Sequence, residues 1–227
     1  MIRVTENFRK IQELLATATA NAGRTAASVQ LLAVSKRKSV AAILEAIAAG
    51  QRHFGENFVQ EGLGKIKEIA NDDLTWHFIG HLQTNKTRRV AEHFQWIHTL
   101  ERLKIAQRLS RQRPYYAEDL NVCIQVNIDR EVGKSGVFEE ELHELAHSIA
   151  ELPKLRLRGL MCIPTVRQTT EEQREPFARL REHFEALQVS GLKLDTLSMG
   201  MTADYEAAIQ EGATLVRIGT ALFGRRE

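Results

Sequence analysis

Apolar residues near the start of the chain recur at the spacing of one helix face. Five of them follow one another at steps of four, three, four and three residues, which places them on the same side of an α-helix. An Asn-Ala-Gly sequence soon after them is a natural helix stop. We therefore predict an amphipathic N-terminal helix whose buried face consists of Val4, Phe8, Ile11, Leu15 and Ala18.

From residue 29 onward, short apolar runs alternate with segments of helical spacing. The runs have the length of β-strands, and the helical segments are mostly longer. The predicted strands cover residues 29–35, 52–55, 75–80, 95–100, 121–127, 155–162, 196–200 and 214–218. The predicted helices between them cover residues 40–49, 58–70, 86–93, 102–113, 138–152, 171–188 and 203–211.

This alternation predicts parallel strands that are covered by helices. Eight strand segments share about 199 residues, or about 25 residues per unit, which favours a (β/α)8 barrel. A doubly wound open sheet is the alternative, but it would more often carry a glycine-rich fingerprint at residues 35–38, which are Ser-Lys-Arg-Lys. We predict an α/β protein with a single TIM barrel domain spanning residues 1–227, and an extra N-terminal helix that covers its exterior or one end.

The composition is that of an ordinary globular protein, with 43% hydrophobic and 26% charged residues. The formal net charge is only +2, without the clustered excess of Lys and Arg that a nucleic-acid-binding surface shows. No apolar stretch approaches the roughly 20 residues that span a bilayer, and charged residues interrupt the N-terminus where a signal peptide is apolar. We therefore expect no nucleic-acid partner, no membrane partner and a cytoplasmic location.

The two cysteines, Cys123 and Cys162, both lie inside apolar strand-like runs. We expect buried free thiols in a reducing compartment. Neither cysteine belongs to a CxxC motif or to Cys/His spacing of the zinc-binding kind, so we predict no metal site.

Lys36 stands at the end of the first predicted strand, and the active site of a barrel forms at this end of its strands. A charged residue that flanks an apolar run is usually a solvated surface group. An amine in a partly apolar pocket, however, loses its proton more easily and can attack an aldehyde to form a Schiff base. The residues that follow the last two strands favour this second interpretation.

Small and hydroxyl-bearing residues lie at the end of the seventh strand and after the eighth. Ser198, Met199 and Gly200, and then Gly219 and Thr220, offer hydroxyls and backbone N–H groups where barrels frequently hold phosphate. Taken alone, the second pair could be no more than a turn. Together with a lysine across the barrel mouth, these residues indicate a ligand with an aldehyde and a phosphate, and pyridoxal 5′-phosphate (PLP) has both.

Arg217 lies between two apolar residues of the eighth strand, and a buried arginine needs a partner. One interpretation is an ion pair with a carboxylate such as Asp195 or Glu206. The other is a hydrogen bond to the ring nitrogen of a bound cofactor. A guanidinium donates but does not accept, so it would leave a pyridine nitrogen unprotonated and the ring a poor electron sink.

An ordered set of motifs runs from residue 33 to residue 224. The motifs are Ala-Val-Ser-Lys at 33–36, Phe-Gly-Glu-Asn at 54–57, Trp-His-Phe-Ile-Gly at 76–80, Leu-Gln-Thr-Asn-Lys at 82–86, Gly-Lys-Ser-Gly at 133–136, Gly-Leu-Met at 159–161 with Pro164, Leu-Ser-Met-Gly-Met at 197–201 with Asp204, and Val-Arg-Ile-Gly at 216–219 with Phe-Gly at 223–224. This set closely resembles the YggS/PROSC family of pyridoxal phosphate homeostasis proteins. One departure is Ser39, where family members commonly have proline, and we expect it to affect only loop stiffness.

The resemblance implies a barrel like the N-terminal domain of bacterial alanine racemase, with PLP bound to Lys36 as a Schiff base. It also implies that Arg217 faces the pyridine nitrogen and that Asn57 lies near the cofactor ring. His77 either lines the pocket or is a structural histidine, and Lys134 is either a mobile surface lysine, which we favour, or a secondary aldehyde contact. The implied phosphate contacts are Ser198, Gly219 and Thr220, with Met199 and Gly200 beside them in the cofactor site.

Racemases and decarboxylases that share this barrel use a second, β-rich domain, which in the racemases supplies a catalytic tyrosine opposite the lysine. We expect no such domain here, and none of Tyr115, Tyr116 and Tyr205 is an obvious partner across the ring. We therefore predict a monomeric, non-catalytic PLP-binding protein that buffers PLP or delivers it to apoenzymes, and so influences vitamin B6 and amino-acid balance. The alternatives are a weak PLP-dependent amino-acid racemase and a cofactor-free lyase in which Lys36 forms a Schiff base with a sugar phosphate.

Overall fold

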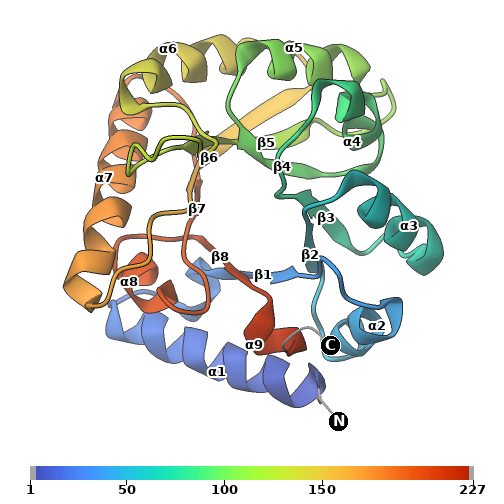
Figure 1. Cartoon of the computed structure of the whole chain (residues 1–227), viewed down its shortest axis with the longest axis vertical. Coiled ribbons are helices and arrows are strands. Elements are labelled where there is room, and N and C mark those ends of the chain that lie inside the picture. Colours follow the sequence, from blue (N-terminus) through green and yellow to red (C-terminus); the bar gives the residue numbers. More distant parts are fainter. Residues whose placement is uncertain (1–3, 225–227) are drawn as a thin grey trace.

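Eight parallel strands close into a barrel in the computed structural model, which describes residues 4–224 (Figure 1). Each strand pairs with the next, and the first and last strands close the ring, with Gln30 opposite Leu215 and Ala33 opposite Ile218. The predicted (β/α)8 barrel is confirmed, and the open-sheet alternative is wrong. The strands are β1 (Gln30–Val34), β2 (His53–Glu56), β3 (Thr75–Phe78), β4 (Trp96–Leu100), β5 (Leu120–Val126), β6 (Leu155–Cys162), β7 (Thr196–Ser198) and β8 (Leu215–Ile218).

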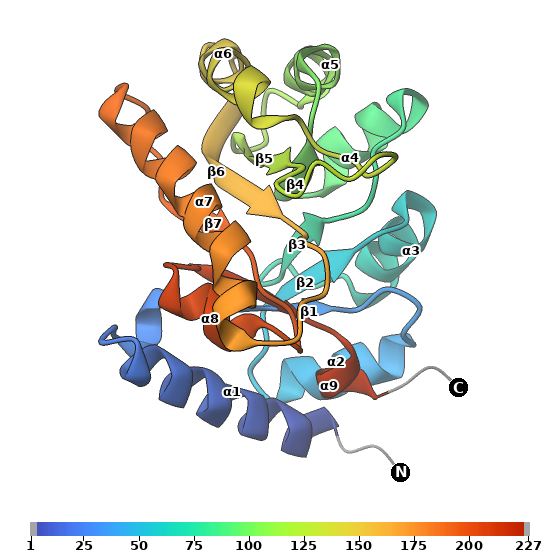
Figure 2. The same cartoon turned by 60° about the vertical axis from the view of Figure 1, so that its left-hand side comes forward.

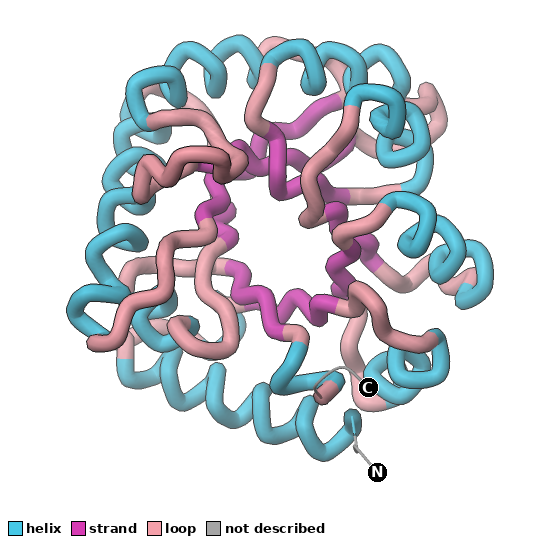
Figure 3. The backbone as a smooth tube through the Cα atoms, in the orientation of Figure 1, coloured by secondary structure: helices cyan, strands magenta, loops and turns pink. Residues whose placement is uncertain are grey.

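Helices form an outer ring around the strands, as the tube in Figure 3 shows. Within residues 4–224, none of them is long and apolar enough to cross a membrane. The helices are α1 (Val4–Asn21), α2 (Val40–Ala48), α3 (Val59–Ile69), α4 (Thr87–His93), α5 (Leu103–Gln112), α6 (Glu139–Ala150), α7 (Thr170–Val189), α8 (Tyr205–Gln210) and α9 (Thr220–Phe223), with short 3₁₀ turns η1 (Ala26–Ser28) and η2 (Thr84–Lys86).

The N-terminal helix covers the outside of the barrel near the closing strands (Figure 2). All five apolar positions predicted for the inner face of α1 are buried, and the helix packs against α2, α8 and α9. Asn7 Nδ2 also donates a hydrogen bond of 2.9 Å to the main-chain oxygen of Leu222 in α9. The helix therefore joins the first part of the chain to the last helix.

Two segments differ from the prediction near the C-terminal ends of the last strands. β7 ends at Ser198, two residues early, and Gly200 already has a φ of +91°, which does not continue a strand. Residues 220–223, for which no strand or helix was predicted, form α9, a helix of four residues that is too short to show a helical pattern. Both differences lie at the strand ends where a barrel holds its ligand.

The strands separate two clusters of apolar side chains. The main core lies between the strands and the helices and contains Ile97, Val122 and Leu160. Their immediate neighbours Trp96, Cys123 and Met161 form a second cluster, which must lie inside the barrel because successive side chains of a strand alternate between its faces. Both cysteines are buried and free, as predicted.

Candidate functional site

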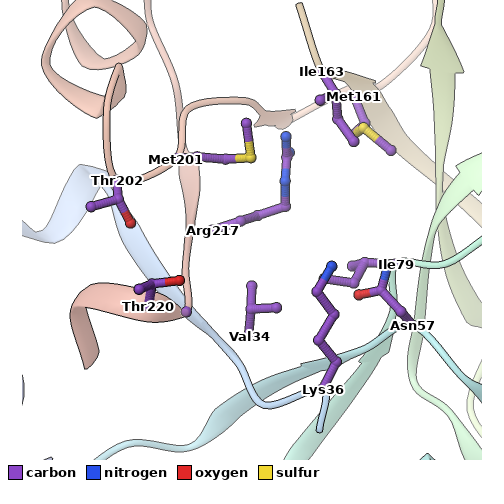
Figure 4. A pocket seen from close by; sticks show the side chains of 11 residues that line it. Val34, Lys36, Asn57, Ile79, Met161, Ile163, Met201, Thr202, Arg217 and Thr220 are labelled. Atoms are coloured by element: carbon purple, nitrogen blue, oxygen red, sulfur yellow. The ribbon is translucent and has the colours of Figure 1, made fainter. Parts of the chain in front are cut away.

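A cavity of about 210 Å³ lies at the C-terminal ends of the strands (Figure 4). It is lined by parts of β1, β6, β8 and α9 and by the loops after β1, β2, β3, β6, β7 and β8. It brings together five of the residues that the sequence indicated, namely Lys36, Asn57, Arg217, Gly219 and Thr220. The other lining residues are Val34, Ile79, Met161, Ile163, Met201 and Thr202.

Lys36 lies two residues beyond β1, and its side chain extends into the cavity (Figure 4). The residue before it is held on several sides. Ser35 N donates to Gly55 O at 3.0 Å, and Ser35 Oγ donates to Glu56 Oε1 at 2.6 Å. Lys65 Nζ donates to Ser35 O at 2.7 Å. The backbone from which Lys36 extends is therefore well anchored.

Glu56 and Lys65 form a buried ion pair behind this backbone. Lys65 Nζ lies 2.8 Å from Glu56 Oε1 and 2.6 Å from Glu61 Oε1. Burial raises the pKa of Glu56, although hydrogen bonds from Lys65 and Ser35 act in the opposite direction. Glu56 and Ser35 belong to two of the sequence motifs, and both support the lysine loop without lining the cavity.

Arg217 places a nearly buried guanidinium against the cavity, with 5% of the residue exposed. Nη1 donates to Ser198 O at 2.6 Å and to Ser198 Oγ at 2.8 Å, and Nη2 donates to Cys162 O at 2.8 Å. Burial lowers the pKa of Arg217, because the charge is taken out of water. These three bonds set the plane of the guanidinium.

The partners of Arg217 are not carboxylates. Asp195 pairs with Arg158 at 2.7 Å, and Glu206 accepts a hydrogen bond from Tyr205 at 3.0 Å. Within the part of the chain that the structure describes, Arg217 forms no ion pair. The ion-pair interpretation of Arg217 is therefore wrong, and its charge is directed at the cavity instead.

The loops after β7 and β8 give the cavity a side with hydroxyl groups. Thr202 and Thr220 both lie there and are drawn on the same side of Figure 4. Gly219 has little room for a side chain, since a Cβ would lie 3.1 Å from Val34 O and 3.2 Å from Val34 Cβ. A glycine at this position therefore lets the turn after β8 pack closely against β1.

Ser198, Met199 and Gly200 lie behind this side and do not line the cavity. Ser198 and Met199 are fully buried, and the Ser198 side chain contacts Arg217. A Cβ on Gly200 would lie 2.6 Å from Ala208 Cβ, so the residue is small because α8 packs closely on it. Their direct contact with a cofactor stays a prediction.

Asn57 presents the cavity with a polar atom that has no protein partner. Its Oδ1 atom is buried and accepts no hydrogen bond. Apolar side chains of Ile79, Met161 and Ile163 complete the lining. The sequence did not indicate these three residues, or Thr202, as part of the site. Their position at or just after strand ends is the signal that could have identified them.

His77 is fully buried inside the barrel and does not line the cavity. Its two ring nitrogens contact His53 at 3.1 Å and His98 at 2.9 Å. This placement agrees with a structural histidine. Lys134 forms an ion pair with Glu131 in the loop after β5, in agreement with a surface lysine.

Within residues 4–224, no tyrosine lines the cavity. Tyr115 and Tyr116 are 91% and 77% exposed in the loop before β5, where their rings pack edge to face. Tyr205 begins α8 and donates its hydroxyl hydrogen to Glu206. A tyrosine acid or base opposite Lys36 is therefore not supplied by the described residues.

The chain matches a known domain family over almost all of its length. The family of the alanine racemase N-terminal domain matches residues 4–227. The pyridoxal phosphate homeostasis protein of Pseudomonas aeruginosa is 56% identical over 227 residues, which cover 100% of this chain and 97% of that protein. The Escherichia coli K12 protein of the same name is 50% identical, and the match covers 99% of this chain and 97% of that protein.

Solved structures show the same relationship. PipY of Synechococcus elongatus PCC7942, solved with PLP bound, matches with a TM-score of 0.86 and 39% identity over 97% of this chain and 100% of that chain. Alanine racemase of Corynebacterium glutamicum matches with a TM-score of 0.73 and 16% identity, over 99% of this chain and 60% of that chain. The second match shows a shared fold alone.

Proposed function

The chain belongs to the family of pyridoxal phosphate homeostasis proteins, and from this membership we propose that it binds PLP in the cavity of Figure 4 and buffers or delivers it without catalysis. One observation carries the proposal: the cavity joins a lysine amine, a nearly buried guanidinium and two threonine hydroxyls at the C-terminal ends of the strands. The barrel, as one domain, is sufficient for this role.

The residues present fit PLP, which supplies an aldehyde, a phosphate and an aromatic ring. The Lys36 amine is the group in the cavity that condenses with an aldehyde. Ile79, Met161 and Ile163 offer apolar surface to a ring. Asn57 Oδ1 has no hydrogen-bond partner and offers an acceptor, and buried polar atoms generally have such a partner.

Each polar residue has a distinct role in this proposal. Thr202, Thr220 and the backbone at Gly219 bind the phosphate through hydroxyl and N–H groups. Arg217 faces the ring nitrogen as a donor that keeps its own proton, because a guanidinium does not titrate near neutral pH. The nitrogen therefore stays unprotonated, and the ring withdraws electrons weakly.

The cavity favours a carrier over a racemase. Racemisation needs a proton acceptor on one face of Cα and a proton donor on the other. Lys36 is available for one face, but the described tyrosines lie elsewhere and His77 is sealed inside the barrel. We further propose that PLP-dependent apoenzymes are transient recipients, that the protein is a monomer, and that it works in the cytoplasm, where free cysteines are the rule.

An absorption spectrum tests the cofactor assignment. The purified protein supplied with PLP should show a near-UV/visible band that borohydride removes and that Lys36→Ala lacks. Lys67→Ala, on the exposed side of α3, is the matched control and should keep the band. A protein that shows no such band after PLP is added would refute the assignment and favour a cofactor-free use of Lys36.

Solvent deuterium distinguishes the carrier from the weak racemase. The PLP-loaded protein is incubated with L-alanine or D-alanine in heavy water, and deuterium at Cα is measured. A carrier should give no exchange above that of free PLP. Exchange that is faster than with free PLP and is lost in Lys36→Ala would establish the racemase instead.

A further inference from the structure

A row of polar side chains crosses the inside of the barrel from the cavity to the other end of the strands. Arg217 Nη1 lies 2.8 Å from Ser198 Oγ, which lies 2.7 Å from His98 Nδ1. His98 Nε2 lies 2.9 Å from His77 Nδ1, and His77 Nε2 lies 3.1 Å from His53 Nδ1. The row links β8, β7, β4, β3 and β2.

The arginine determines the direction of every hydrogen bond in this row. A guanidinium only donates, so Ser198 Oγ accepts from Arg217 and has its single proton left for His98 Nδ1. His98 then carries its own proton on Nε2 and donates to His77 Nδ1. By the same reasoning, His77 donates from Nε2 to His53 Nδ1, and His53 keeps its proton on Nε2.

The opposite direction leaves a buried proton without an acceptor. If His98 Nδ1 donated to Ser198, the hydroxyl proton of Ser198 would have no partner among the described residues. Ser198 is fully buried, and such an unmet donor costs about 1–3 kcal/mol. In the direction set by Arg217, the ring proton without a protein acceptor is the one on His53 Nε2. His53 is partly exposed, so this proton can bind water.

All three histidines are neutral in this arrangement. Burial, and after it the nearby charge of Arg217, lowers the pKa of His98 to about 3. Burial also lowers the pKa values of His77 and His53. A neutral ring has one donor and one acceptor, which is what a directed row requires.

We propose that Ser198, His98, His77 and His53 form a directed positioning row that holds the Arg217 guanidinium in one orientation toward the cavity. None of the three histidines lines the cavity, so each acts through Arg217. The consequence for cofactor binding rests on the proposed function, whereas the direction of the row does not. Because Arg217 cannot release its proton, the row is a positioning device and does not carry protons to the cavity.

Histidine tautomers provide the test that is independent of any cofactor. The protein is labelled with nitrogen-15 in histidine, and ring nitrogen shifts are recorded at neutral pH without PLP, with assignments from single variants. His53, His77 and His98 should all be the Nε2–H tautomer. An Nδ1–H tautomer at His77 or His98 would overturn the proposal.

A pair of substitutions at His98 then tests the positioning role. His98→Gln can accept from Ser198 and donate to His77, so the other tautomers should persist and PLP affinity should change less than about twofold. His98→Leu removes both contacts, so the tautomer of His77 should become mixed and PLP should bind about tenfold more weakly. Thermal unfolding and circular dichroism confirm that both variants are folded.

The outcomes separate this proposal from the proposed function. If both variants bind PLP as the unmodified protein does, the row does not position Arg217, and the proposal is wrong. If the unmodified protein binds no PLP, the proposed function fails, but the tautomers still decide the direction of the row.

Discussion

Glu56 shows how a residue outside the cavity can control one inside it. The residue has no exposed surface, and its second carboxylate oxygen, Oε2, has no hydrogen-bond partner. The ammonium group of Lys65 balances the negative charge of Glu56. It also donates a hydrogen bond to Ser35 O, next to Lys36. A buried charge that loses its only cationic partner is strongly destabilising.

Lys65→Met should therefore lower the free energy of unfolding by about 3–5 kcal/mol, measured by urea denaturation. Lys67→Met, on the same helix but exposed, should change it by less than about 0.5 kcal/mol. The double variant Lys65→Met with Glu56→Gln should recover part of the loss, because no charge is then left buried alone. If Lys65→Met and Lys67→Met lower the free energy of unfolding by the same amount, this account is wrong.

The sequence indicated that Lys36 and Arg217 belong to one site, and both line the cavity, but it did not show how each is supported. The end of an apolar strand is visible in a sequence, so the position of Lys36 followed from strand–helix alternation. The partners of Arg217 depend on which side chains of distant strands point inward at the same level of the barrel. Ser198 was therefore expected at the phosphate, whereas its side chain lies beside Arg217.

At the scale of elements, apolar periodicity predicted the long helices and the strands to within a few residues. It failed where local backbone geometry determines the bounds of an element, as at the end of β7 and in the four residues of α9. Gly200 is the clearest case, because its positive φ and its contact with α8 fix how the loop leaves the strand. Neither constraint leaves a periodic signal.

Gly200→Ala should cost more stability than the backbone conformation alone explains. Gly191 has a similar φ of +101° but no atom within 4 Å of an added Cβ, so Gly191→Ala measures the conformational penalty, about 1–2 kcal/mol. Gly200→Ala adds a contact of 2.6 Å with Ala208 Cβ, and the total should reach about 3 kcal/mol or more. Equal costs in urea denaturation would show that α8 moves aside freely.

At the scale of the whole molecule, the polar barrel interior links folding to pH. Burial lowers the pKa of His98 to about 3 and that of His77 well below its usual value. In the unfolded chain both rings bind a proton near pH 6.5. The free energy of unfolding therefore keeps its full value above about pH 6.5. It falls as the pH drops toward 3, since only the unfolded state takes up these protons.

Between about pH 6.5 and 5, the two histidines together should lower the free energy of unfolding by about 3 kcal/mol. Urea denaturation at a series of pH values measures the slope. His98→Gln should reduce that slope by about half, because the glutamine amide does not titrate. A slope that is unchanged in His98→Gln would assign the pH dependence to other groups.

The closing pair of strands has a further consequence for how the protein is made. Lys36 follows β1, whereas Arg217 lies in β8, and these two strands are hydrogen-bonded neighbours although about 180 residues separate them. A ribosome synthesises β1 first among the strands and β8 last. A nascent chain thus carries Lys36 for most of its synthesis without Arg217 and Gly219, which complete the cavity. Under the proposed function, PLP can therefore be captured at this site only after β8 has emerged and paired with β1.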